Sequence, residues 1–270
     1  MSGAPPLQRL SLNQITVDQW TLPELVDGCA RAGVTTIAPW REKVAEVGLE
    51  RAGRLIADAG LSVSSLCRGG FFPAAGERER RRAEDDNRRA VEEAASLGTD
   101  VLVLVCGAPV GRDLPGARAA IAAGIERLAP HAADHGVRLG IEPLHPMMIG
   151  ERSAIVTLGE AVDLALRLDA GVVVDAYHVW WDPALERELA RAAGRIVGFH
   201  VSDWLVPTPD LLQGRGMMGD GIIDLRRIRG LVEAAGYDGP IEVEVINRDL
   251  WRMPGDDLVA LTCERFAACC

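Results

Sequence analysis

Lysine is nearly absent from this 270-residue chain: Lys43 is the only one, and arginine supplies the rest of the 29 basic residues. This composition argues against catalysis through a lysine Schiff base. Acidic residues outnumber basic ones by 39 to 29, which leaves a net charge of −10. Binding to nucleic acid or to an anionic membrane needs clustered positive charge, so we expect neither as a partner.

Other signals are missing as well. The six cysteines form no CxxC motif, the N-terminus has no apolar secretory segment, and no apolar run approaches the roughly 18 residues that span a bilayer. We therefore expect a reduced, cytoplasmic protein that does not enter membranes.

What the chain does contain is a regular alternation of short apolar runs with longer helical patterns. Runs rich in Val, Ile and Leu are typical of strands that are buried on both faces of a parallel sheet. The eight predicted strands are 9–16, 35–40, 61–69, 101–107, 137–144, 171–179, 196–203 and 240–247. No GxGxxG follows the first strand, which disfavours a dinucleotide-binding sheet. The pattern predicts a single (β/α)8 TIM-barrel domain over residues 1–270.

The intervening helices carry recognisable start and stop signals. Thr21 and Glu24 predict a capping box at the start of the first helix, and a glycine follows most of the helices. The predicted helices are 22–32, 46–59, 77–97, 116–135, 157–168, 184–193, 224–235 and 256–268.

Metal-binding side chains occur near the ends of four successive predicted strands: Glu142 on the first, Asp175 and His178 on the second, His200 and Asp203 on the third, and Glu242 and Glu244 on the fourth. Barrel enzymes place their reactive groups at this end of the strands, and a buried carboxylate needs a compensating partner. One divalent cation bound by groups from all four strands would satisfy them, with Mn²⁺ favoured and Mg²⁺, Co²⁺ and Zn²⁺ as alternatives. The competing interpretation is that hydrogen bonds inside the barrel satisfy each residue separately.

Several motifs carry a family resemblance. The segments IEPLHP, VVDAYHVWW, GFHVSDW, GRGMMGDGIIDL and YDGPIEVEV resemble the sugar phosphate isomerase/epimerase family, which has a xylose isomerase-like barrel. The resemblance implies that Glu142, Asp175, His200 and Glu244 bind the metal. It favours Glu244 over Glu242, because the family ligand lies five residues after the YDG turn. Glu242 would then sit deeper in the barrel or pair elsewhere.

The resemblance also implies substrate contacts. His178 of the D-x-x-H element would contact substrate or a second metal, and Arg215 would grip substrate; a core histidine and a solvent-facing arginine are the alternatives. His145 would touch substrate or cap its loop. Glu151 would offer a carboxylate that contacts the substrate or supports a residue that does, or it would be an exposed loop residue.

Aromatic residues make up only 4% of the chain, yet several fall at or just past predicted strand ends. Trp40, Phe72 and Trp181 are the ones that we expect to contact substrate, because aromatic faces stack on sugar rings or flat groups. Core packing beneath loops is the alternative for each of them.

The implied activity is that of a metal-dependent isomerase or epimerase of a small sugar-like molecule. It acts by proton abstraction next to a carbonyl, with Glu142 and Glu244 as base and acid. The sequence shows no phosphate-binding loop, so we expect an unphosphorylated substrate.

Three alternatives stay open. A lyase on the same scaffold would dehydrate an inosose or, with a small partner subunit, cleave a 3-oxo C-glycoside. A non-catalytic sugar-binding barrel is the second alternative. A repair endonuclease is the third, but it would need more histidines and a basic groove. Homo-oligomers, dimers or tetramers, are common in the family.

Overall fold

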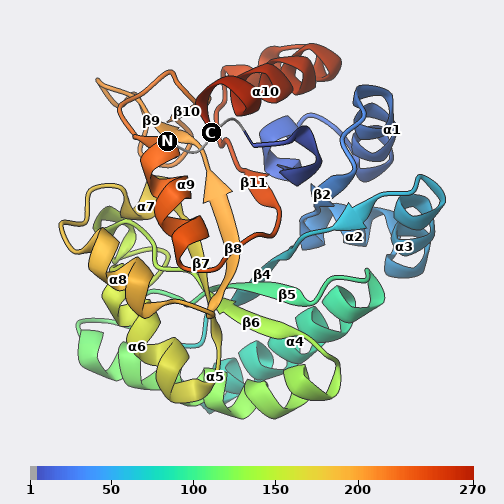
Figure 1. Cartoon of the computed structure of the whole chain (residues 1–270). Helices are drawn as coiled ribbons and strands as arrows, with labels where there is room; N and C mark the ends of the chain where they lie inside the picture. The colour runs from blue at the N-terminus through green and yellow to red at the C-terminus, as the bar shows by residue number, and fades with distance from the viewer. Residues whose placement is uncertain (1–4) are drawn as a thin grey trace.

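Parallel strands curl around the centre of the molecule, and helices cover their outer face (Figure 1). A computed structural model describes residues 5–270. Within that range nine strands form one parallel sheet in the order β3-β2-β1-β11-β8-β7-β6-β5-β4. Their bounds are β1 Leu10–Asn13, β2 Thr36–Ala38, β3 Ser62–Val63, β4 Leu66–Gly70, β5 Val101–Val105, β6 Arg138–Ile141, β7 Gly171–Asp175, β8 Ile196–Val201 and β11 Ile241–Val243. This nearly closed barrel confirms the predicted fold class.

The third predicted strand, 61–69, is not continuous. Its first part, β3, pairs with β2, whereas its second part, β4, pairs with β5. Between them the hydroxyl of Ser65 donates to Glu242 inside the barrel, and that of Ser64 lies 2.7 Å from the Ser11 hydroxyl. A bridge between Trp40 and Cys67 joins the two ends of the sheet.

The helices form the outer ring, and α10 packs beside α1 (Figure 1). Their bounds are α1 Leu22–Ala32, α2 Arg41–Val47, α3 Leu49–Asp58, α4 Glu77–Ser96, α5 Leu114–Asp134, α6 Leu158–Leu168, α7 Ala176–Val179, α8 Leu185–Arg191, α9 Leu225–Ala234 and α10 Gly255–Cys269. The capping box of Thr21 and Glu24 is confirmed. The helix predicted over 46–59 is found as α3 but begins later, at Leu49, because Gly48, with φ of +88°, separates it from α2.

Short elements complete the fold. Four 3-10 helices are η1 Leu7–Arg9, η2 Gln14–Val17, η3 Pro146–Met148 and η4 Leu250–Arg252. Two short antiparallel strands, β9 Asp203–Trp204 and β10 Arg215–Gly216, pair within the long segment after β8. None of the helices in residues 5–270 is long and apolar enough to cross a membrane.

Alternation along the strands decides which side chains enter the barrel. Deep inside it, Val101, Val103, Val173 and Val197 form an apolar cluster. Asp175 lies two residues beyond Val173 on β7, so it points to the same side of the sheet. The barrel therefore has an apolar base and a polar upper end.

Candidate metal centre

Four buried side chains from neighbouring strands converge at the upper end of the barrel. Glu142 follows β6, Asp175 ends β7, His200 lies on β8 and Glu244 follows β11. Each offers one oxygen or nitrogen atom, and these four atoms all lie within 4.8 Å of one another. The four residues that the sequence indicated as ligands are thus brought together.

The imidazole of His200 tests whether this group fits a cation. Its Nδ1 lies 3.5 Å from Oε1 of Glu142 and 4.0 Å from Oε2 of Glu244. Both ring nitrogens are buried, and neither makes a hydrogen bond with the described part of the chain. A buried nitrogen without a partner is costly, so a cation bound through Nδ1 and the nearby carboxylates fits the residues present.

Burial and close charged neighbours shift the pKa values of the four residues at the centre. Burial raises the pKa of Glu244 to about 8, with Arg215 opposing the shift, and it also raises the pKa of Glu142. The pKa of Asp175 is lowered: burial acts against ionisation, but the charge of Arg215, the neighbouring imidazoles and the backbone N–H of Tyr177 together outweigh it. For His200, burial opposes the charged form, but Glu242 and the other carboxylates raise its pKa to about 10.

Glu242 lies on the same strand as Glu244 but faces other partners. One of its oxygens accepts a hydrogen bond of 2.6 Å from the Asn13 amide, and the other accepts one of 2.8 Å from the Ser65 hydroxyl. Its Oε2 is also 3.5 Å from Nε2 of His200, on the side away from Glu142. Glu242 is therefore held deeper in the barrel, behind the imidazole, as the sequence indicated.

Arg215 connects the centre to the cavity. Its Nη1 donates to Oδ2 of Asp175 at 2.9 Å and to Oε2 of Glu244 at 3.1 Å. Its guanidinium carbon lies 4.5 Å from the centre of the Tyr177 ring. The side chain is buried, so the alternative of a solvent-facing loop residue is wrong.

His178 is buried next to Arg215, with its Nε2 at 3.2 Å from Nη2 of that residue. The backbone N–H of His145 donates to Nδ1 of His178 at 3.1 Å. Burial lowers the pKa of His178 to about 3, so the ring is neutral. The strand predicted over 171–179 ends at Asp175, and His178 reaches the cavity from the short helix α7.

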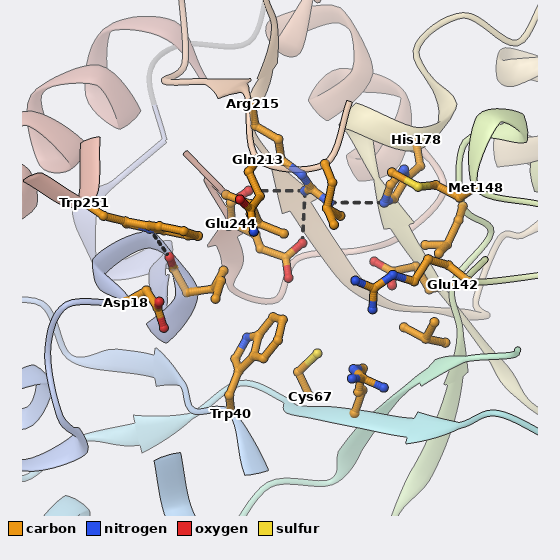
Figure 2. A pocket seen from close by; sticks show the side chains of 17 residues that line it. Asp18, Trp40, Cys67, Glu142, Met148, His178, Gln213, Arg215, Glu244 and Trp251 are labelled. Atoms are coloured by element: carbon orange, nitrogen blue, oxygen red, sulfur yellow. Dashed lines mark hydrogen bonds and ion pairs between the residues drawn. The ribbon is translucent and has the colours of Figure 1, made fainter. Parts of the chain in front are cut away.

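The centre opens into a cavity of about 320 Å³. Figure 2 shows Glu244 and Arg215 toward one side of it, Glu142 and His178 toward the other, and Trp40 and Trp251 along its wall. Trp40 donates its indole N–H to Asn13, and Trp251 donates its own to the carbonyl of Ile15. With the N–H groups used in this way, the two indoles present mainly their apolar surfaces to a ligand.

Cys67 also lines the cavity. Burial raises the pKa of its thiol well above the usual value. A neutral thiol is a poor nucleophile, so Cys67 acts as part of the wall.

Three residues expected to contact substrate lie outside this cavity. Phe72 packs against α5, where a Cβ added to Gly124 would meet its ring at 2.3 Å; it faces outward because it follows the turn after β4. Trp181 donates its N–H to the carbonyl of His178 and contacts the ring of His145. Glu151 is exposed on its loop. For these three residues the expectation of substrate contact is corrected.

His145 also lies outside the cavity lining. Its ring is 4.9 Å from that of Trp204, and its Nδ1 accepts a hydrogen bond of 3.3 Å from the backbone of Met147. Of the two interpretations of His145, the structure shows the loop-capping contact.

The lining residues that sequence reasoning missed include Arg68, Arg152, Gln213 and Trp251. Trp251 lies on η4, just beyond the eighth predicted strand. A signal existed, since segments that follow barrel strands build the active sites of this architecture. Gln213 belongs to the long segment after β8, which does border the cavity as expected.

Comparison with known proteins agrees with this architecture. Residues 26–269 match the family described as xylose isomerase-like TIM barrel. A 3-dehydroshikimate dehydratase of Pseudomonas aeruginosa PAO1 is 31% identical over 239 residues, which cover 84% of this chain and 36% of that protein. The chain thus spans about a third of the length of that curated relative.

Solved structures show the same fold. Protein SMc04130 from Sinorhizobium meliloti 1021 is 48% identical, with a TM-score of 0.96, covering 98% of this chain and 99% of that one. The IolI protein, crystallised with a zinc atom, has a TM-score of 0.83 at 17% identity, with coverage of 95% and 96%.

Proposed function

This chain belongs to the xylose isomerase-like TIM barrel family, and we propose that it is a metal-dependent enzyme that removes a proton next to a carbonyl in a small polyhydroxylated substrate. The observation that carries the proposal is the convergence of Glu142, Asp175, His200 and Glu244 at the base of a cavity large enough for such a molecule. Neither ring nitrogen of His200 makes a hydrogen bond with residues 5–270, which disfavours a purely structural role for this residue.

The four residues would hold one divalent ion. When bound, the ion supplies a Lewis acid that polarises the carbonyl oxygen of the substrate. Oxygen ligands with one nitrogen suit Mn²⁺, Mg²⁺ and Co²⁺, and Zn²⁺ joins the ions to test because the IolI protein of the same fold carries zinc.

Glu142 and Glu244 are the proposed proton carriers. They reach the cavity from β6 and β11, with β7 and β8 between these strands, and Figure 2 shows them on different sides of the space. One carboxylate can therefore take a proton from one face of a bound substrate while the other faces the opposite side. Arg215 orients Glu244 through its ion pair, and Trp40 and Trp251 exclude water from part of the cavity.

Two outcomes can follow proton removal. In dehydration, the electron pair of the broken C–H bond forms a double bond, the β-hydroxyl leaves, and the proton joins it as water. In isomerisation or epimerisation, the proton returns to carbon. Similarity to a dehydratase favours the first outcome, and the two separated glutamates favour the second. We propose dehydration first, with isomerisation or epimerisation as the second candidate.

A single experiment tests both outcomes. The protein is loaded separately with Mn²⁺, Mg²⁺, Co²⁺ or Zn²⁺ in D₂O and incubated with 3-dehydroshikimate, inososes, ketoses and 3-oxo-glycosides, and NMR follows the products. Dehydration predicts loss of water from one of these compounds, whereas epimerisation predicts deuterium at a carbon next to the carbonyl with inverted configuration. Absence of both with every compound and ion would contradict the proposal and favour a non-catalytic sugar-binding barrel.

Other properties stay predictions. These are a single domain over residues 1–270, a cytoplasmic location, and assembly as a homo-oligomer or with a small partner subunit.

A further inference from the structure

Besides Arg215, two arginines line the cavity without belonging to the four-residue centre. Arg68 lies on β4, and Arg152 lies in the loop that follows η3. The carbonyl of Arg152 accepts a hydrogen bond from Gly107, just beyond β5. Both arginines therefore come from the β4–β5 side of the barrel, next to the strand that leads to Glu142.

A bulge in β4 brings Arg68 into the cavity. Cys67 pairs with Val103 and Gly69 pairs with Leu104, so Arg68 is an extra residue without a partner in β5. Consecutive residues of a regular strand point to opposite faces, yet Cys67 and Arg68 both line the cavity. The bulge redirects the arginine inward, as bulges next to binding sites commonly do.

The guanidinium of Arg152 makes no hydrogen bond or ion pair with any residue between 5 and 270, although its backbone is fixed. Its backbone N–H donates to the carbonyl of Met148 at 2.9 Å, and its carbonyl accepts from Gly107 at 3.0 Å. A half-buried guanidinium on a fixed backbone is placed for a group that comes from outside the chain.

Arg68 has only weak protein partners. Its Nη2 lies 4.0 Å from Glu42, whose side chain is 63% exposed, and such pairs contribute little. Its guanidinium carbon also lies 4.5 Å from the centre of the exposed Phe71 ring. These contacts steady the side chain but leave its charge without a close carboxylate.

The acidic groups around the cavity already have positive neighbours. Asp175 and Glu244 pair with Arg215, Glu142 lies beside His200, and Asp18 is 3.4 Å from Lys43. Within residues 5–270, neither Arg68 nor Arg152 pairs with a carboxylate that lines the cavity.

We propose that the substrate carries an anionic oxygen group, a carboxylate or a phosphate, and that Arg68 and Arg152 bind it. Paired guanidinium groups match the oxygens of either anion. The inference rests on the proposed function, since it names the substrate class of the same cavity. It also makes Arg68 and Arg152 the residues that discriminate acidic from neutral substrates.

Binding measurements test the inference without turnover. The fluorescence of Trp40 and Trp251 is followed in the metal-loaded protein with matched probes: 3-dehydroshikimate against its methyl ester, and fructose 6-phosphate against fructose. We expect the anionic member of one pair to bind at least about tenfold more tightly. Arg68→Met and Arg152→Met should each weaken that binding roughly 10- to 100-fold and change the binding of the neutral member less than about threefold.

Control variants distinguish a specific loss of anion binding from a general effect on the protein. Arg54→Met removes an exposed arginine of α3 and should change none of the four affinities. Arg68→Lys and Arg152→Lys retain the charge, so they should restore part of the preference if the methionine variants fold poorly. Equal binding of both members in both pairs would overturn the inference, as would variants that weaken neutral and anionic probes alike.

The result is separate from the test of the proposed function. A preference for anions that depends on Arg68 and Arg152, without any reaction in D₂O, would refute the enzymatic proposal and leave the binding site standing. Turnover of neutral ketoses with unchanged KM in both arginine variants would refute the inference and leave the enzyme standing.

Discussion

Oε2 of Glu242 lies 3.5 Å from Nε2 of His200, and the two residues face each other in register on β11 and β8. The opposite ring nitrogen, Nδ1, faces Glu142 and Glu244. Asn13 and Ser65 hold the carboxylate of Glu242 in place. Glu242 thus stands behind the proposed ligand, where a carboxylate orients an imidazole and makes it more basic.

Glu242→Gln should weaken metal binding by about 10- to 100-fold, because the amide loses the charge that supports the imidazole. Competition with a chromophoric chelator measures the Kd directly. Glu186→Gln, on the exposed surface of α8, is the matched control and should bind metal as the unaltered protein does. An unchanged Kd in Glu242→Gln would show that Glu242 only fills the barrel.

Glu142→Gln and Glu244→Gln should each lower turnover of the substrate found in the NMR experiment by about 10²- to 10⁴-fold, since the amide cannot carry the proton. Circular dichroism and thermal unfolding check that both variants fold. Turnover close to that of the unaltered protein in either variant would remove that residue from the acid–base assignment.

Metal affinity should fall as the pH is lowered below about 10, and more steeply below about 8. The pKa of Glu244 is raised to about 8 and that of His200 to about 10, so in the metal-free protein both hold a proton at neutral pH. A cation must displace these protons, and each one lowers the apparent affinity by up to about tenfold per pH unit below its pKa. Calorimetry in two buffers of different ionisation enthalpy counts the protons released, and a count of zero would contradict the prediction.

The same two pKa values predict how stability depends on pH in the metal-free protein. Both are raised above the usual values of 4.5 and 6.5, so the folded state binds more protons than the unfolded state. The free energy of unfolding should therefore decrease from about pH 5 to pH 10 through these groups. Urea unfolding at several pH values measures the trend, and Glu244→Gln should flatten it below pH 8.

Asn87→Ala should destabilise the fold by about 1–3 kcal/mol. The buried Asn87 amide accepts from the backbone N–H of Gly70 at 2.6 Å and donates to the carbonyl of the same residue at 2.8 Å. Its loss leaves buried backbone groups at the end of β4 without partners. Urea unfolding compares the variant with Arg82→Ala, an exposed change on the same helix α4, which should shift the free energy of unfolding by less than about 0.5 kcal/mol.

Predictions from local pattern were accurate where a single physical rule governed the outcome. Apolar runs gave the strands, and the expected chain reversals were found at Gly33 and Gly60, both with positive φ. The position of polar residues near strand ends also identified the set that converges at the upper end of the barrel, because parallel strands all present their carboxyl ends on one side.

Predictions from local pattern were inaccurate where contacts between residues far apart in the sequence determined the structure. Phe72 follows a strand as Trp40 does, but it packs against α5 while Trp40 lines the cavity. The division between β3 and β4 depends on the hydroxyls of Ser64 and Ser65, whose partners lie 53 and 177 residues away. Contacts between residues so far apart in the sequence cannot be predicted from the local spacing of residue types.

By itself the sequence determined the barrel class and the candidate side chains near the strand ends, because period, apolar runs and strand order are properties of consecutive residues. The resemblance of its motifs to a known family then selected the four that converge. Only the tertiary structure decided that Arg68 turns into the cavity and that the guanidinium of Arg152 makes no hydrogen bond or ion pair with residues 5–270. The inward turn of Arg68 comes from a bulge against β5, and the half-buried guanidinium of Arg152 has no carboxylate among its neighbours in that range. Both depend on segments that meet only when the barrel closes.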